Sequence, residues 1–183
     1  MTEDQKHIWE REKRAVGELR DGLGKPVDPA IVETVTVLRL LDFTTHSSCG
    51  GHLDRPASPY VAFRASSNQA DRRFIEEAET QDEQRRRKDE AMQHNAAVLD
   101  RLLGYLERFY VDRDVPLQQR LICQGFGVIG YRLTTQSADL VHVATKDERH
   151  DLVDVQRQEF DAFTEFLKAE FFGTKDDAPS RAA

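Results

Sequence analysis

The sequence predicts an α+β fold in which a mixed or antiparallel sheet is covered by helices, one of them long and partly polar. Apolar residues at helical spacing occur near both ends of the chain and in its middle. Between them lie two groups of short segments rich in β-branched residues. Strands that cluster in this way favour a sheet with helices packed on it. The length of 183 residues and a hydrophobic content of 39% suit one domain with its own core.

The N-terminal part of the chain predicts two helices. The first covers residues 3–23 and forms an N-terminal unit, residues 1–24, ahead of a single α+β domain over residues 25–172. The second helix begins at Asp28, whose carboxylate can cap free backbone N–H groups, and Pro29 suits the first helical position.

The first β region predicts two strands around a glycine-containing loop. Residues 43–48 are rich in β-branched and small polar side chains, which favours a short strand. Gly50 and Gly51 then require a turn or an unusual backbone. Residues 60–64 alternate roughly between apolar and polar side chains and predict the next strand.

The second β region predicts a hairpin and one further strand. Residues 121–123 and 128–134 are expected to form strands around a turn at residues 124–127. Residues 140–144 are a third strand candidate.

Two long helical segments follow the two β regions. Residues 70–111 are expected to be helical throughout, with a polar extension over residues 70–91. The second half of that helix is amphipathic, with an inward face of Ala96, Leu99, Leu103, Leu106 and Tyr110. A last amphipathic helix is expected over residues 148–172, and residues 173–183 are expected to be a disordered tail.

Charge and apolar content restrict the expected partners. The net charge of −7 disfavours an RNA or DNA partner, because phosphate neutralisation dominates such binding. The N-terminus lacks an apolar signal segment, and no stretch approaches the roughly 18 apolar residues of a membrane span. The protein is therefore expected in the cytoplasm without a membrane partner, with Cys49 and Cys123 as free thiols or ligands.

The segment from Thr44 to Asp54 is the strongest candidate site, and its leading interpretation is a ligand loop. Glycines let a backbone approach a ligand closely, and exposed N–H groups can hold an anion. His52 is expected to act as a general acid or base, and Cys49 as a nucleophile if His52 lowers its pKa. The residues expected to bind the cofactor or ligand are Thr45, Ser47, Ser48, Gly50 and Gly51.

Two other interpretations of this segment stay open. In the first, the small residues simply build a tight turn around a buried Cys49. In the second, His46, Cys49 and His52 bind zinc, since imidazole and thiolate are ligands that zinc prefers. The fourth zinc ligand would then come from Asp54, Cys123, His142 or His150.

Residues 25–63 resemble a family of bacterial and phage proteins. The shared signature is Ser-Cys-x-Gly-His followed by a Pro-aromatic-Val strand, carried here by Ser48, Cys49, Gly51 and His52 and then by Pro59, Tyr60 and Val61. This resemblance identifies a family without supplying an activity.

More distantly, the same stretch is similar to the tRNA wybutosine-synthesising methyltransferases of the third step. The members of their Thr-Thr-Ser-Ser-Cys-Ser-Gly-Arg loop that match are Ser47, Ser48, Cys49 and Gly51. His52 stands where that family has arginine, and Gly50 where it has serine. The resemblance implies a related α/β scaffold with its site near this loop, and in that family S-adenosylmethionine is the cofactor and tRNA the substrate.

The resulting expectation is a small-molecule or nucleotide-type ligand site at Thr44–Asp54, with methyltransferase-like activity if the protein is an enzyme. One alternative is a non-enzymatic interaction or regulatory protein, such as a phage or bacterial accessory factor. It would bind its partner, or form a homodimer, through the polar helix at residues 70–91. The other alternative is a zinc-binding protein.

Overall fold

The sheet is four-stranded and antiparallel throughout, so the expected α+β class is confirmed with the antiparallel arrangement. The computed structural model describes residues 1–20, 24–66 and 75–176. The strand order is β1-β2-β4-β3, which makes β1 an edge strand. The strands are β1 (Thr44–His52), β2 (Ala57–Arg64), β3 (Leu121–Gly125) and β4 (Tyr131–Thr135).

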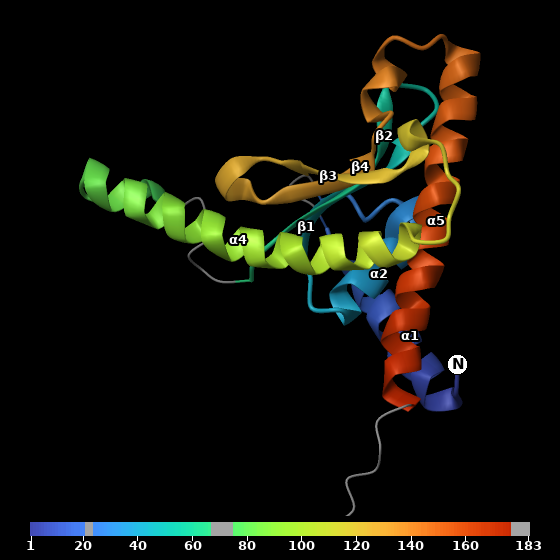
Figure 1. Cartoon of the computed structure of the whole chain (residues 1–183), viewed down its shortest axis with the longest axis horizontal. Coiled ribbons are helices and arrows are strands. Elements are labelled where there is room, and N and C mark those ends of the chain that lie inside the picture. The colour runs from blue at the N-terminus through green and yellow to red at the C-terminus, as the bar shows by residue number, and fades with distance from the viewer. Residues whose placement is uncertain (21–23, 67–74, 177–183) are drawn as a thin grey trace, which may run out of the picture.

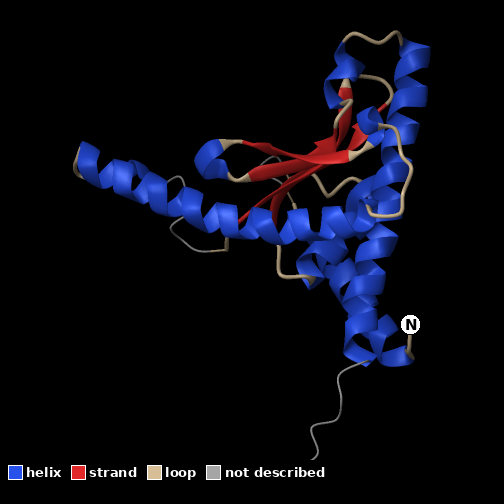
Figure 2. Cartoon of the chain, viewed as in Figure 1, coloured by secondary structure: helices blue, strands red, loops and turns tan. Residues whose placement is uncertain are grey.

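Helices make up most of the remaining described chain (Figure 2). The α-helices are α1 (Glu3–Glu18), α2 (Val32–Leu40), α4 (Gln81–Tyr110) and α5 (Lys146–Asp176). Short 3-10 turns are η1 (Pro29–Ile31), η3 (Leu117–Gln119), η4 (Gly127–Ile129) and η5 (Ala138–His142). None of the helices within the described residues combines the length and the apolar character needed to cross a bilayer.

The core lies between α2, α4 and α5 on one side and one face of the sheet on the other. Val61 and Leu133 are cross-strand partners on that face, and both are fully buried. Phe109 near the end of α4 meets Phe163 of α5 with ring centroids 5.0 Å apart. Figure 1 shows this end of α4 lying against α5. Burial of such large apolar side chains is the main stabilising contribution in a domain of this size.

The opposite face of the sheet is more polar, and we call it the outer face. Alternation along a strand places Tyr60 and Arg132 on this face, because their neighbours Val61 and Leu133 point into the core. The Arg132 guanidinium carbon lies 4.2 Å from the centroid of the Tyr60 ring. Near one end of the face, Ser58 Oγ donates to the Ala138 carbonyl of η5 at 2.7 Å.

The first helix is shorter than the sequence predicts. It ends at Glu18 instead of residue 23, and Arg20 then forms an isolated bridge with Pro26. Residues 21–23 lie outside the described residues. Gln5 Nε2 donates to the Phe172 carbonyl at 3.1 Å and so fixes α1 to the end of α5.

The expectation of one unbroken helix over residues 70–111 is wrong at residues 78–80. Thr80 caps α4 by accepting a hydrogen bond from the Glu83 N–H at 3.2 Å, so a new helix starts there. Residues 67–74, which include part of the expected extension, lie outside the described residues. No residue of α4 before Ala91 is buried, and this N-terminal third of the helix extends beyond the sheet in Figure 1.

Three smaller expectations also need correction. Residues 140–144 do not form a strand: residues 140–142 are the end of η5, and residues 143–144 form the turn after it. Only Val141 of this stretch is buried, and a short helical turn is enough to bury one side chain. On the inward face of α4, Leu106 is buried as expected, but Leu103 is 43% exposed and its neighbour Leu102 is buried in its place. Helix α5 continues to Asp176, beyond its expected end, and residues 177–183 lie outside the described residues.

Candidate functional site

The segment expected to be a loop is the second half of an edge strand. Strand β1 continues through the glycines to His52, because Cys49 pairs with Tyr60 and His52 pairs with Ala57 on β2. The turn comes later, at residues 53–56. The candidate side chains therefore stand on a hydrogen-bonded strand, whose geometry is more rigid than that of a loop.

The two glycines allow close contacts with other parts of the chain. A Cβ on Gly50 would lie 2.9 Å from Ala30 Cβ of η1. Gly51 has φ +78°, and a Cβ there would lie 3.0 Å from atoms of both Pro59 and Val153. These residues must be glycine because β1 lies directly against η1, β2 and α5 at this point.

Asp28 is brought to the strand by this close approach. Its Oδ2 accepts a hydrogen bond from the Gly50 backbone N–H at 2.9 Å. Asp28 makes no side-chain cap on the turn that follows it, so the expected capping role is wrong. The carboxylate satisfies an edge N–H of β1 instead of the N–H groups of its own helical turn.

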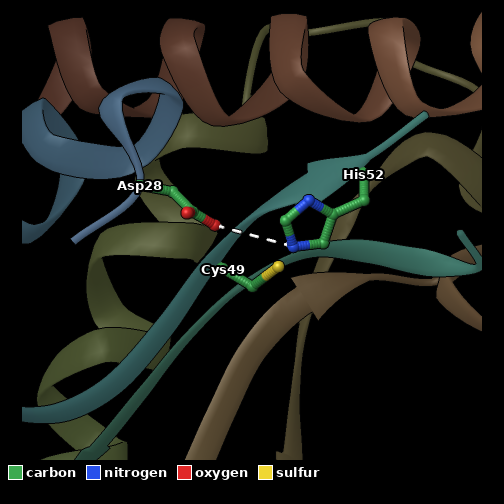
Figure 3. Close-up of side chains that lie close together, drawn as sticks. All are labelled: Asp28, Cys49 and His52. Atoms are coloured by element: carbon green, nitrogen blue, oxygen red, sulfur yellow. Dashed lines mark ion pairs between the residues drawn. The ribbon is translucent and has the colours of Figure 1, made fainter. Parts of the chain in front are cut away.

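Asp28, Cys49 and His52 form one cluster (Figure 3). One donor atom from each of the three side chains lies within 4.8 Å of the other two, and Asp28 Oδ2 lies 4.0 Å from His52 Nε2. Residues three apart in a regular strand point to opposite faces. The left-handed backbone of Gly51 interrupts that alternation between Cys49 and His52, which allows both side chains to reach the same point.

Two arginines contact the cluster from different sides. Arg157 of α5 donates from Nε to the Gly50 carbonyl at 2.8 Å and from Nη2 to the Gly51 carbonyl at 3.1 Å. This contact fixes the end of the strand that carries Cys49 and His52. Arg55, in the turn, places Nη2 2.7 Å from His52 Nε2, so the guanidinium donates to the ring nitrogen that faces Asp28.

The electrostatics of the cluster do not favour a free thiolate. Burial raises the pKa of the Cys49 thiol, and the neighbouring Asp28 carboxylate acts in the same direction. The backbone hydrogen bond from Gly51 and the charge of Arg55 oppose this shift only in part. The expected role of Cys49 as a nucleophile required His52 to lower the pKa of its thiol, and this arrangement, in which the pKa is raised, disfavours that role.

His46 lies apart from the cluster, so the structure does not bring together the expected His46, Cys49 and His52 set. Burial lowers the pKa of His46, and the charges of Arg64 and Arg132 add to this effect. A hydrogen bond with the Ile129 backbone acts in the opposite direction. The structure also leaves out of the cluster the four expected further ligands, which are Asp54, Cys123, His142 and His150.

The remaining expected ligand-binding residues line a separate cavity. Thr45, Ser47 and Ser48 all contribute to it, and Ser47 Oγ lies 3.1 Å from Tyr60 Oη. The single site expected at Thr44–Asp54 is therefore two adjacent features in the structure, a three-residue cluster and a hydroxyl-lined cavity. It missed Asp28 as a site residue, since an aspartate before a proline already had an explanation as a helix cap.

Comparison with known proteins adds no relative. No protein-family model matches the chain, and no curated protein or solved structure is significantly similar to it.

Proposed function

We propose that this protein binds a transition-metal ion of the zinc class at Asp28, Cys49 and His52. The observation that carries the proposal is the convergence of a carboxylate, a thiol and an imidazole within 4.8 Å of one another. These are the three ligand types that zinc uses in proteins. Their side chains come from two separate segments of the chain, so the cluster is a product of the fold.

The distances in the cluster fit a site that contracts slightly around an ion. Zinc bonds of about 2.0–2.3 Å place tetrahedral ligands roughly 3.3–3.7 Å apart. Asp28 Oδ2 and His52 Nε2 are 4.0 Å apart, so the two side chains need to move together by less than about 1 Å. Rotation about side-chain bonds is enough for such a movement.

The contacts of Gly50 and Arg157 with the cluster are of the kind expected around metal ligands. The Gly50 N–H fixes one oxygen of Asp28, and Arg157 holds the two carbonyls between Cys49 and His52. Hydrogen bonds of this kind orient ligands before the ion arrives. A bound cation would also stabilise the Cys49 thiolate that burial disfavours.

A set of three protein ligands leaves one coordination position for water or a small molecule. This is the arrangement of catalytic zinc sites, where the ion acts as a Lewis acid or activates water. The small-molecule site expected from the sequence would then include this open position. Methyltransferase-like activity and partner binding through residues 70–91 remain predictions from the sequence.

Isothermal titration of metal-free protein with zinc tests the proposal. We expect one ion per chain, and at least a hundredfold weaker binding in Asp28→Ala, Cys49→Ser and His52→Ala, since each variant removes a ligand. His46→Ala is the matched control and should bind zinc as the wild type does. Equal loss in His46→Ala and His52→Ala, or unchanged binding in Asp28→Ala, would overturn the assignment.

A further inference from the structure

A cavity of about 260 Å³ lies along β1, between this strand and the chain that links α1 to α2. Two of its walls are residues 45–48 of β1 and residues 25–27 of the linking chain. Each wall ends one residue before a member of the metal cluster, since Val27 precedes Asp28 and Ser48 precedes Cys49. The cavity therefore adjoins the cluster.

The polar lining of the cavity consists of donors and cations. Arg20 and Lys25 contribute positive charge, and His46 contributes an imidazole. The side-chain hydroxyls belong to Thr45, Ser47, Ser48 and Tyr60. No carboxylate occurs among the lining residues in the part of the chain that the structure describes. Cationic and hydroxyl-bearing side chains that line one cavity favour an oxyanion as the ligand, although the protein as a whole has a net charge of −7.

The edge of β1 adds a backbone donor. The N–H of Gly50 points away from β2, because it donates to Asp28. Backbone groups two residues apart in a strand point to the same side. The N–H of Ser48 is therefore directed toward the edge of β1 that faces away from β2, and Ser48 lines the cavity.

Arg20 is held in place at the cavity by the end of α1. Its Nη1 donates to the carbonyls of Gly17 and Leu19, both at 2.8 Å. The bridge between Arg20 and Pro26 brings the two ends of the linking chain together beside β1. A guanidinium fixed in this way loses little side-chain freedom when an anion binds.

We propose that this cavity binds the phosphate group of a small organic phosphate ester. A tetrahedral phosphate has more acceptor oxygens than a planar carboxylate, which suits a cavity lined by several hydroxyl-bearing residues, the Ser48 N–H and two cationic side chains. The apolar part of the lining, Leu19, Pro26, Val27 and Val35, would contact the carbon portion of the ligand. The volume lies below the roughly 300–1,000 Å³ of drug-sized sites, so the ligand is compact.

The location of the cavity also indicates how the ligand would lie. With its phosphate beside Ser47 and Ser48, the ligand would lie next to the metal cluster, because Cys49 follows Ser48 in β1. That placement rests on the metal site proposed above, whereas phosphate binding itself does not.

Calorimetric titration with inorganic phosphate, glycerol 3-phosphate and acetate tests the proposal on zinc-loaded and metal-free protein. We expect both phosphates to bind and acetate to bind at least tenfold more weakly. The double variant Arg20→Gln/Lys25→Gln should weaken phosphate binding by roughly tenfold or more, since charge-assisted hydrogen bonds are lost. The matched control is Arg85→Gln/Lys88→Gln, which removes the same charge from exposed positions of α4 and should leave binding unchanged.

The outcomes separate this inference from the metal proposal. Zinc binding without phosphate binding, or equal losses in the two double variants, would overturn the phosphate site and leave the metal site standing. Phosphate binding in a protein that binds no zinc would support the cavity and contradict the metal site. Acetate binding as tight as phosphate binding would refute the assignment to phosphate esters.

Discussion

Asp28 Oδ2 accepts a hydrogen bond from the Gly50 backbone N–H at 2.9 Å, and this contact joins the start of η1 to the edge of the sheet. It places a carboxylate beside a thiol and an imidazole from a different segment of the chain. The proposed metal site depends on this contact, because Asp28 is separated from Cys49 in the sequence by all of α2.

Replacing Arg55 should strengthen metal binding. Its Nη2 lies 2.7 Å from His52 Nε2 and so engages the lone pair that a metal would use, while its positive charge repels a cation. We expect zinc affinity to rise roughly tenfold in Arg55→Ala, a change of about 1.4 kcal/mol. Competition with a chelating indicator measures the affinity. Arg85→Ala removes a distant exposed charge and should have no effect. A weaker site in Arg55→Ala would mean that Arg55 helps to form it.

Gly51→Ala should destabilise the fold, whereas Gly17→Ala should not. The new Cβ at position 51 would lie 3.0 Å from Pro59 and Val153 on a backbone with φ +78°, so we expect a loss of about 1–3 kcal/mol. Gly17 lies in α1 with nothing within 4 Å of its Cβ position, and alanine there should add about 0.5–1 kcal/mol. Urea denaturation of both variants measures the difference. Equal stabilities would contradict this account of the glycines.

Glu159 should stabilise the folded state more than an exposed carboxylate does. Its side chain is 8% exposed and accepts hydrogen bonds at 2.7 Å from Tyr110 Oη and from Arg113 Nη2. Glu159→Gln leaves Arg113 without its charged partner, and we expect a loss of about 2–3 kcal/mol after allowing for the partial exposure of Arg113. Glu165→Gln breaks an exposed pair with Lys168 and should cost less than about 1 kcal/mol. Thermal unfolding of the two variants compares them, and equal shifts would be evidence against the role of Glu159.

Stability should fall at alkaline pH through Tyr110. Burial raises the pKa of its hydroxyl above the ordinary value, and the Glu159 carboxylate adds to the shift. A pKa that is higher in the folded state gives a stabilisation that is complete below about pH 10, where the unfolded tyrosine titrates, and that is lost as pH rises further. The stability difference between the wild type and Tyr110→Phe should therefore shrink above pH 10. A difference that is constant between pH 8 and pH 11 would contradict the buried environment of this hydroxyl.

Much of the fold could be predicted from local pattern. The hairpin of β3 and β4 and the helices α2 and α5 were expected because their apolar periodicity and their Gly and Pro boundaries act over a few residues. The break at residues 78–80 could not be predicted from periodicity, since a polar segment carries no apolar stripe. Residues 140–144 have the composition of a strand but lie outside the sheet. Whether such a segment pairs as a strand depends on its tertiary surroundings, which local composition does not determine.

The sequence predicted where the candidate site lies, but not which side chains form it. Cys49 and His52 stood out because of their chemistry and the glycines between them. His46 shares their spacing of three residues, yet it lies near Arg64 and Arg132, because the direction of a side chain depends on its place in the strand and on the bulge between Thr45 and Ser47. Asp28 joins the cluster through a contact between distant segments, which no local pattern encodes.

The most direct test of the central claim is the electronic spectrum of the protein titrated with Co²⁺, which substitutes for zinc and reports its ligands. We predict that one equivalent gives a thiolate-to-cobalt charge-transfer band together with the intense visible bands of a four-coordinate ion. The charge-transfer band should vanish in Cys49→Ser, and the visible bands should change in Asp28→Ala but not in His46→Ala. A wild-type spectrum without a thiolate band, like that of hydrated Co²⁺, would contradict the proposed metal site.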